Sequence, residues 1–363
     1  MEPINVGVIG TGWCGGIRAE TCFASPLVDR LYISEIKPER LAEVAAAVDP
    51  VIATERWEEI AQHPDIDAII ISATPETTHY PMAKAALEAG KHVLLEKPIA
   101  LTLDEADDLI GVAERNGLKF TIGYSQRFNN KQAMVKRSIL DGTIGTPVSA
   151  LASRHITRNL GNKIGGRIIM TPASMEATHD IDFLLWCLQP ARPVRVYAQA
   201  VEIVQKPKFG TVDCMWMIIT MDNGVVVTVG AGWILPPGYP NFSSTWIEFV
   251  GSEGALMVDD THRDILLSTM EKGMTLPLST MPGEQVGHVF AGPMDLETKH
   301  FLEAVVFDRD VMVKPHEARL AMEVYMAADL SAELNVPIDL PMTKEQEEHA
   351  FMVGVRIPES AKA

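Results

Sequence analysis

The sequence predicts an α/β protein, in which an N-terminal doubly wound parallel sheet is followed by a C-terminal α/β domain with a large, mostly antiparallel sheet. Three observations support this fold class. Strand-like runs alternate with helical patterns in the first 125 residues. Past Arg127, one helix that ends near Asp141-Gly142 is followed by successive strand-like runs. The 363 residues are 47% hydrophobic and 22% charged, an ordinary globular composition. We expect domains at residues 1–125 and 126–341, with a tail at 342–363.

Hydrophobic periodicity predicts the elements of the N-terminal sheet. The strand-like runs are residues 6–9, 31–34, 68–72, 92–95 and 120–123. Between them, apolar residues at helical spacing predict helices at 38–48, 77–89 and 104–116. Strands separated by helices are typical of a parallel sheet, because each helix carries the chain back to the edge where the next strand begins.

The C-terminal part has a different pattern. Its strand-like runs are residues 148–154, 194–204, 212–221, 225–233, 245–251 and 255–259. Turn signals such as Asp222-Asn223-Gly224 separate them, which is typical of antiparallel pairing. Helices are expected at 175–187, 296–306 and 315–334, and loops rich in Gly or Pro at 161–167 and 235–242.

The charge balance excludes several classes of partner. With 48 acidic and 31 basic side chains the net charge is -17, so nucleic acid and anionic membranes are poor partners. The chain has no basic leader segment and no run near the roughly 18 apolar residues of a membrane helix, so we expect a cytoplasmic protein. Cys14, Cys22, Cys187 and Cys214 lack metal-ligand spacing, which predicts reduced thiols and no metal site.

A glycine-rich motif follows the first predicted strand and opens a helix. It reads Gly10-Thr11-Gly12-Trp13-Cys14-Gly15. In a dinucleotide-binding fingerprint the first glycine permits the tight turn, the second lets the backbone approach the pyrophosphate, and the third allows the helix to pack closely on the strand. The N–H groups at the start of the helix suit phosphates. The sequence therefore predicts a Rossmann domain in which Gly10, Gly12, Trp13, Cys14 and Gly15 lie at the cofactor.

Glu35 supports this assignment and indicates which cofactor binds. It follows the second predicted strand, about 20 residues after Gly15, where a carboxylate can bond both ribose hydroxyls. A carboxylate at that place repels the 2′-phosphate of NADP, so NAD is the expected cofactor. Lys37 could pair with a phosphate, but a solvated lysine at the start of the next helix is the preferred interpretation.

A Glu96-Lys97-Pro98 triplet ends the strand-like run at 92–95. This is the edge at which ligands bind in open α/β sheets. The proline favours an extended conformation for Lys97, which directs the ammonium away from any helix. By themselves, these residues favour a surface lysine paired with Glu96 over a catalytic lysine.

Five motifs occur together in one order. They are Gly10-x-Gly12-x-x-Gly15, Thr74-Pro75-x-x-x-His79, Glu96-Lys97-Pro98, Gly123-Tyr124-x-x-Arg127-Phe128 and His179-Asp180-Ile181-Asp182. This set resembles the family of glucose–fructose oxidoreductase and inositol dehydrogenase, and the resemblance spans most of the chain. It implies a Rossmann domain, a second domain whose open sheet mediates homodimers or homotetramers, an NAD cofactor and a small sugar or polyol substrate.

The resemblance also implies roles for individual residues. Lys97 corresponds to the catalytic lysine and His179 to the proton-transfer histidine. The cofactor contacts implied are Thr74, Pro75, His79, Glu96 and Lys97, and the substrate contacts are Tyr124, Arg127 and His155.

The helix around His179 can be analysed by itself. Met175, His179, Asp182 and Trp186 follow one another at spacings of four, three and four, so histidine and carboxylate share one face. Asp182 would orient the imidazole and raise its basicity, unless the pair only packs. Relatives carry an aspartate where this chain has Met175, and Glu176 lies about 100° around the helix from it. Glu176 and Asp182 are candidate substrate contacts, and a lone Glu176–His179 pair does not suffice for a metal.

The expected chemistry is hydride transfer between nicotinamide and a secondary alcohol, with Lys97 and His179 sharing the proton of the reacting oxygen. One alternative is an NAD-dependent glycosidase that transiently oxidises a sugar hydroxyl, eliminates the glycosidic group, adds water and returns the hydride. A second alternative is an NAD-sensing binding protein without turnover, which leaves the lysine and the histidine unexplained.

Basic residues gather in one segment of this acidic chain. They are Arg154, His155, Arg158, Lys163 and Arg167. Arginine suits oxyanions because its donors form a fixed fork, and the resemblance places this stretch over the substrate, which predicts an anionic sugar derivative. Ion pairs with acidic residues at the surface or at a subunit interface explain the segment equally well.

Overall fold

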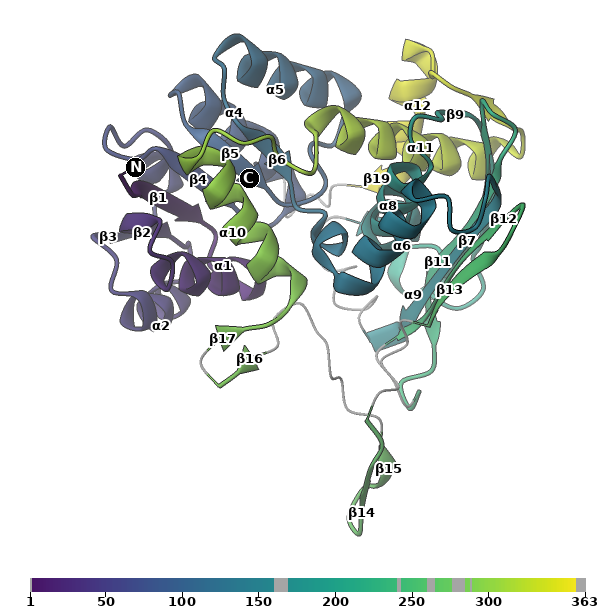
Figure 1. The fold of residues 1–363 in the computed structure, drawn as a ribbon, viewed down its shortest axis with the longest axis horizontal. Coiled ribbons are helices and arrows are strands. Elements are labelled where there is room, and N and C mark those ends of the chain that lie inside the picture. The colour runs from purple at the N-terminus through teal and green to yellow at the C-terminus, as the bar shows by residue number, and fades with distance from the viewer. Residues whose placement is uncertain are drawn as a thin grey trace. The chain divides into compact units, whose positions relative to one another are not determined.

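The structure is a computed structural model that describes residues 2–159, 169–239, 243–259, 265–275, 285–287 and 289–356. The chain forms two compact units, each built around its own sheet (Figure 1). The first unit contains Met1–Asn129 and Met281–Arg319, and the second contains Asn130–Thr280 and Leu320–Ala363. The sequence prediction placed all of residues 126–341 in the second domain, whereas the structure places Met281–Arg319 in the first unit.

The first unit has a six-stranded sheet with the order β3-β2-β1-β4-β5-β6. Every strand pair in it is parallel, which confirms the predicted sheet. This is the Rossmann order, in which the winding reverses between β1 and β4 and leaves a crevice for a ligand there. The strands are β1 (Ile4–Ile9), β2 (Val28–Ser34), β3 (Ile52–Thr54), β4 (Ala68–Ile71), β5 (His92–Leu95) and β6 (Phe120–Ile122).

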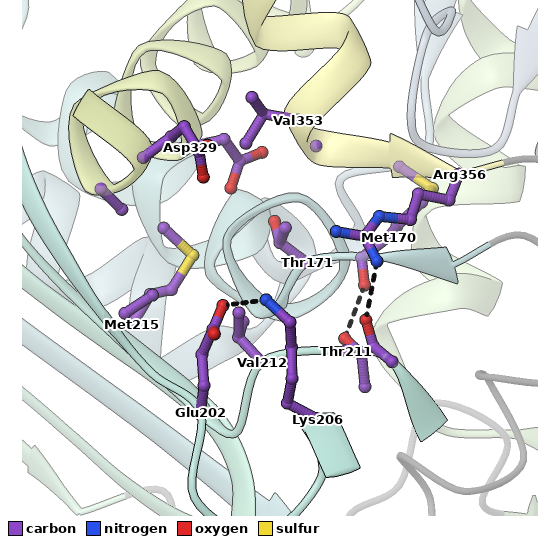
Figure 2. Close-up of a pocket in the computed structure, with 15 residues that line it drawn as sticks. Met170, Thr171, Glu202, Lys206, Thr211, Val212, Met215, Asp329, Val353 and Arg356 are labelled. Carbon is purple, nitrogen blue, oxygen red and sulfur yellow. Dashed lines mark hydrogen bonds and ion pairs between the residues drawn. The ribbon is translucent and has the colours of Figure 1, made fainter. Parts of the chain in front are cut away.

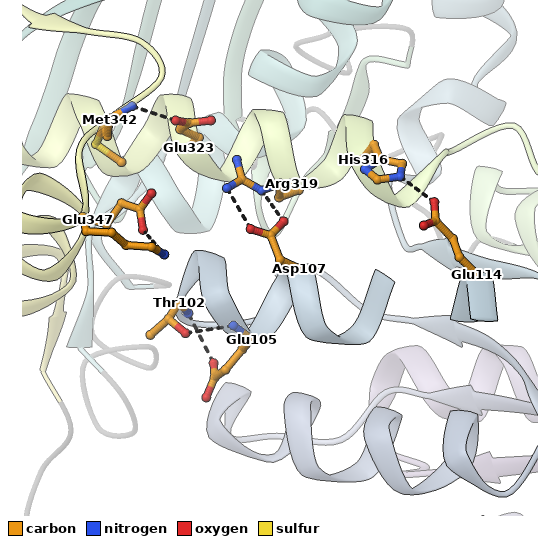
Figure 3. Close-up of polar contacts among 10 residues, drawn as sticks. Thr102, Glu105, Asp107, Glu114, His316, Arg319, Glu323, Met342 and Glu347 are labelled. Atoms are coloured by element: carbon orange, nitrogen blue, oxygen red, sulfur yellow. Dashed lines mark hydrogen bonds and ion pairs between the residues drawn. The ribbon is translucent and has the colours of Figure 1, made fainter. Parts of the chain in front are cut away.

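Helices connect these strands. They are α1 (Trp13–Phe23), α2 (Pro38–Val48), α3 (Trp57–Ala61), α4 (His79–Glu88) and α5 (Leu103–Arg115), with single turns η1 (Glu76–Thr78) and η2 (Ser125–Phe128). α5 begins in a capping box, in which Thr102 Oγ1 accepts from the Glu105 N–H and the Glu105 carboxylate accepts from the Thr102 N–H (Figure 3). β3 and α3 are missing from the sequence prediction because they are too short to show a period.

α10 (Pro293–Val306) brings the late part of the chain back to the first sheet. Its Phe301 and Leu302 are fully buried in the same core as Val6 and Val8 of β1. Helical periodicity identifies such a helix but does not indicate which sheet it packs on. The sequence prediction therefore placed this helix in the second domain, whereas it belongs to the first unit.

α11 (Pro315–Leu334) begins in the first unit and is anchored there on α5. Arg319 donates to both carboxylate oxygens of Asp107, at 2.6 and 3.0 Å, and His316 Nε2 lies 2.8 Å from Glu114 Oε1 (Figure 3). These pairs hold the first turns of α11 against the outer side of α5.

The second unit has a seven-stranded sheet with the order β13-β12-β7-β11-β10-β9-β18. Only β7 and β11 pair in parallel, so the sheet is mostly antiparallel, as predicted. The strands are β7 (Pro147–Thr157), β9 (Pro193–Val201), β10 (Cys214–Met221), β11 (Val226–Leu235), β12 (Ser243–Gly251), β13 (Ala255–Asp259) and β18 (Ile338–Asp339). Two-stranded ribbons are β8 (Ile169–Met170) with β19 (Val355–Arg356), β14 (Leu267–Thr269) with β15 (Gly273–Thr275), and β16 (Gln285–Val286) with β17 (Val289–Phe290).

Helices cover one face of this second sheet. They include α6 (Asn130–Leu140), a π-helical turn (Ala173–Ala177, η3) that leads into α8 (Thr178–Leu188), α9 (Lys206–Phe209) and α12 (Lys344–Gly354). Phe183 of α8 meets Phe249 of β12 edge-on, with ring centroids 6.0 Å apart. None of the helices within the described residues is long and apolar enough to cross a membrane.

The opposite face of the second sheet carries exposed apolar side chains. Trp216 and Ile218 of β10 and Trp246 of β12 are 42%, 47% and 38% exposed. The next residue along each strand, Met217 in β10 and Ile247 in β12, is buried. Alternation along a strand sends successive side chains to opposite faces. The sheet therefore has one face packed under helices and one apolar face without a cover in the described chain.

Candidate active site

The glycine motif forms the turn between β1 and α1. Gly10 has φ +79°, a region that favours glycine, and its N–H donates to Ser34 O. A Cβ on Gly15 would lie 1.8 Å from Gly10 O, whereas a Cβ on Gly12 would have no heavy atom within 4 Å. α1 begins without a side-chain cap at Gly12. The turn thus leaves open space and uncapped N–H groups at the helix start, which is what a pyrophosphate needs.

Trp13 and Cys14 occupy the first turn of α1. Trp13 is exposed and Cys14 is partly buried. Burial, with the nearby Glu96 carboxylate, raises the pKa of the Cys14 thiol to about 12, so Cys14 is a neutral thiol at neutral pH and not a nucleophile.

Glu35 follows β2 and is nearly buried. Its Oε2 accepts from the Thr11 N–H at 2.9 Å and its Oε1 from the Lys37 N–H at 3.1 Å. The carboxylate therefore faces the glycine turn, at the position predicted for a ribose contact. Arg40 was not predicted: its Nε donates to Thr11 O at 2.8 Å and a terminal nitrogen to Gly12 O at 3.2 Å, so it braces the same turn.

His79 links the loops that follow β4 and β5. Its Nδ1 lies 2.8 Å from Pro98 O and its Nε2 lies 3.1 Å from Ala73 O, and the side chain is buried. The first loop contains Thr74 and Pro75, and the second contains Lys97. The ring thus lies between a backbone carbonyl of each loop and holds the two loops in place, and a cofactor contact of His79 stays a prediction.

Arg18 of α1 holds the Glu96-Lys97-Pro98 turn. The guanidinium is fully buried and pairs with Glu96 at 2.5 Å and with Glu297 of α10 at 2.7 Å, and it donates to Thr298 Oγ1 at 3.0 Å. Burial alone would lower the pKa of Arg18, but the two carboxylates raise it well above its ordinary value. Lys97, next to Glu96, is partly exposed. Sequence reasoning missed Arg18, whose partners lie 78 and 279 residues away.

Tyr124 and Arg127, predicted substrate contacts, are buried inside the first unit. Arg127 is 1% exposed; it pairs with Glu317 at 2.5 Å and donates to Met312 O at 3.1 Å. Tyr124 is also 1% exposed. These contacts stabilise the first unit, and the substrate contacts of Tyr124 and Arg127 stay predictions.

In the second unit, His179 lies in the first turn of α8 and is partly exposed, with Asp182 buried one turn later. Met175 and Glu176 precede it in the π-helical turn, where the i→i+5 pattern adds a residue to the turn. The predicted α-helical offset between Met175 and His179 is therefore wrong, while that between His179 and Asp182 holds. Glu176 Oε1 accepts from Trp233 Nε1 at 3.1 Å.

The basic residues predicted to bind an anionic substrate have different partners in the structure. Arg154 makes a two-pronged bond to the buried Asp180, with both N···O distances 2.8 Å, and Arg158 Nε donates to Ile234 O at 3.1 Å. Arg154 is thus already neutralised by a carboxylate. Lys163 and Arg167 lie outside the described residues.

His155 lies on the other face of the second sheet from Arg154, because neighbouring residues of a strand alternate. Its ring packs on Trp216 with centroids 5.5 Å apart, and burial lowers the pKa of the imidazole. His155 therefore lies on the other face of the sheet from Arg154 and Asp180, and its substrate contact stays a prediction. Within the described residues, no group of three or more His, Cys, Asp or Glu side chains could hold a metal ion.

Comparison with known proteins identifies similar chains. Residues 4–124 match the family model for the oxidoreductase family with an NAD-binding Rossmann fold, and residues 133–257 match the model for the GFO/IDH/MocA C-terminal domain. An uncharacterized oxidoreductase, YrbE of Bacillus subtilis, is 24% identical over 95% of this chain and 98% of its own length. The scyllo-inositol 2-dehydrogenase (NAD(+)) of Bacillus subtilis is 26% identical over 94% of this chain and 98% of its own. Scyllo-inositol dehydrogenase from Lactobacillus casei, solved with NAD(H) and scyllo-inositol, has the same fold, with a TM-score of 0.80, 20% identity and coverage of 93% and 99%.

The two glycines give a matched pair of variants. Gly12→Ala adds a methyl group in open space, so thermal stability should stay near that of the wild type while the dissociation constant for NAD rises about tenfold or more. Gly15→Ala forces its methyl group against Gly10 O, so the free energy of unfolding should fall by about 1–3 kcal/mol. Thermal melting and calorimetric titration with NAD measure both. A Gly12→Ala variant that binds NAD as the wild type does would remove this turn from the pyrophosphate site.

Proposed function

The chain belongs to the GFO/IDH/MocA family of oxidoreductases and is an NAD-dependent oxidoreductase, and from that premise we propose that it transfers a hydride between nicotinamide and a secondary alcohol of a sugar, sugar acid or polyol. The observation that carries the proposal is the fixed position of the Glu96-Lys97-Pro98 turn. Arg18 and His79 tie this turn to the glycine motif and to the loop after β4, all within the first unit.

Residues of this chain hold the cofactor and move the proton. When bound, NAD would supply the nicotinamide that takes the hydride of the carbinol carbon. The uncapped start of α1 binds the pyrophosphate and Glu35 the adenosine ribose. Lys97 and His179 share the proton that leaves the hydroxyl as the C–H bond breaks, and the buried Asp182, one turn from His179, stabilises the imidazolium form.

The substrate class is supported by what the relatives are named to act on. The Bacillus subtilis relative is a scyllo-inositol 2-dehydrogenase, and a protein of Thermotoga maritima, 25% identical over 74% of this chain, is a myo-inositol 2-dehydrogenase. A ring carrying several hydroxyl groups is therefore the first compound to test. Met175 lies in the buried π-helical turn, where the family resemblance implies an aspartate, and this difference favours a substrate other than unmodified inositol.

Replacing Lys97 or His179 tests the chemistry. Lys97→Met and His179→Asn should each lower kcat by about 10²-fold or more with NAD binding kept, because general acid–base catalysis is worth that much. The assay follows NADH formation with a panel of polyols, sugars and sugar acids. Near-native turnover by Lys97→Met would remove the lysine from the mechanism, and aglycone release without net NADH would identify a glycosidase instead.

The same panel tests the charge of the substrate. We propose that an anionic group on the sugar contacts Arg158, Lys163 or Arg167, since Arg154 is committed to Asp180. Alanine variants of the first three should lower kcat/KM for a sugar acid and leave that for its neutral counterpart unchanged. Equal use of the acid and the neutral compound by the wild type contradicts this part of the proposal.

The apolar face of the second sheet supports a homodimer or homotetramer. Exposed tryptophans on one face of a sheet mark an interaction surface, and a second copy offers the same surface. We expect the chain to sediment as a dimer or tetramer, and Trp216→Glu combined with Ile218→Glu to yield monomers. Met352→Glu, at a more exposed apolar position on α12, is the control and should leave the assembly intact. A monomeric wild type at micromolar concentration contradicts the proposal.

A further inference from the structure

The glycine turn is held by an arginine that the dinucleotide fingerprint does not require. Arg40 lies in α2, and each of its three guanidinium nitrogens has a partner within the protein. Nε donates to Thr11 O at 2.8 Å, Nη2 donates to Gly12 O at 3.2 Å, and Nη1 pairs with Glu43 at 2.7 Å. Arg40 therefore acts on the backbone of the turn.

The bonds from Arg40 fix the orientation of two peptide groups. In a trans peptide the N–H points in the direction opposite to the C=O. The carbonyls of Thr11 and Gly12 both point to Arg40. The N–H groups of the same two peptides, which belong to Gly12 and Trp13, therefore point to the side of the turn away from Arg40. N–H groups at the start of a helix are the donors that bind phosphate.

The helix by itself orients only the second of these peptides. The Gly16 N–H donates to Gly12 O at 2.9 Å, at the start of the α1 ladder. Thr11 O lies before that ladder and takes the bond from Arg40 Nε. Because the Thr11 N–H donates to Glu35 at 2.9 Å, Thr11 is held at both its N–H and its C=O by residues that follow β2.

Gly16 leaves the space that the guanidinium occupies. It is buried in α1 and is not one of the three glycines of the fingerprint. A Cβ on Gly16 would collide with Arg40 Nη2. Glycine inside a helix is less favourable than alanine, so its presence here needs a packing reason, and the close approach of Arg40 supplies one.

We propose that Arg40 is a positioning residue for the cofactor. It holds the Thr11 and Gly12 carbonyls so that the N–H groups of Gly12 and Trp13 face the pyrophosphate, and it does this without contacting the cofactor. The inference rests on the proposed binding of the pyrophosphate at the start of α1, and it adds the group that orients the donors there.

Replacing Arg40 tests the proposal with ligands that differ in the pyrophosphate. Arg40→Met removes the donors, so the dissociation constants of NAD and of ADP-ribose should both rise about tenfold. Adenosine has the ribose that Glu35 would bind but no phosphate, and its affinity should stay native. Calorimetric titration measures the first two ligands, and competition with NADH fluorescence measures adenosine. Native affinity for NAD, or an equal loss for adenosine, overturns the proposal.

Gly16→Ala displaces the guanidinium while Arg40 stays in the chain. Alanine is the better helix former, so the melting temperature should not fall, yet the affinity for NAD should fall about as far as in Arg40→Met. In the Arg40→Met background, Gly16→Ala should have no further effect on NAD binding, because the side chain it displaces is gone. Native NAD affinity in Gly16→Ala, or additive losses in the double variant, overturns the proposal.

Two control variants separate this role from a general loss of charge. Arg356→Met also removes an arginine that donates to a backbone carbonyl, Gly210 O at 3.4 Å, but in the second unit beside the pocket drawn in Figure 2. Glu43→Gln removes the ion pair of Arg40 at a carboxylate that is 69% exposed. Both should bind NAD within about twofold of the wild type. A loss in Arg356→Met equal to that in Arg40→Met overturns the proposal.

Comparison with Gly12→Ala separates failure of this inference from failure of the proposed site. If Gly12→Ala weakens NAD binding and Arg40→Met does not, the pyrophosphate lies at the turn and the role of Arg40 is wrong. If neither variant weakens NAD binding, the assignment of the pyrophosphate to this turn is wrong as well.

Discussion

The arrangement of the first unit depends on one buried cation. Arg18 has no exposed side-chain surface, and a guanidinium in that position is stable only where carboxylates surround it. Glu96 comes from the turn after β5 and Glu297 from α10, so one side chain joins the cofactor helix, the turn with Lys97 and a helix from the last quarter of the chain. Loss of one partner in such a buried group typically costs 3–5 kcal/mol, at the upper end of single-residue effects.

This buried cluster explains how the glycine turn and the turn that contains Lys97 are held in fixed positions relative to each other. The glycine turn begins the helix that carries Arg18, and Arg18 fixes Glu96, the neighbour of Lys97. His79 adds a second tie between the loops after β4 and β5. The position of Lys97 is therefore set relative to the glycine turn by buried contacts.

Features that depend on local pattern could be predicted from the sequence. The parallel sheet, its main helices, the glycine turn and the place of Glu35 all follow from periodicity and from spacing along the chain. That Arg154 and His155 lie on opposite faces of the sheet also follows from the sequence, because neighbouring residues of a strand alternate. The burial of Tyr124 and Arg127 could not, since Glu317, the partner of Arg127, lies 190 residues away.

Long-range packing accounts for most of what the sequence does not reveal. The pairing of Arg18 with Glu297 and the return of α10 depend on the tertiary fold, which has no local signal. The π-helical turn before His179 changes the phase between Met175 and His179, and Pro172, which precedes it, equally suits the start of an ordinary α-helix and does not reveal the change. Asp180, read as part of a motif, turned out to be the carboxylate that neutralises Arg154.

A double-mutant cycle between Arg18 and Glu96 tests the central claim most directly. The affinity for NAD and the rate of hydride transfer are measured for Arg18→Met, Glu96→Gln and the double variant, with folding monitored by circular dichroism. If Arg18 acts through Glu96 to hold the turn of Lys97, the double variant should be no worse than the worse single one, with a coupling of about 2 kcal/mol. Additive effects, or single variants with native affinity and rate, would contradict the account.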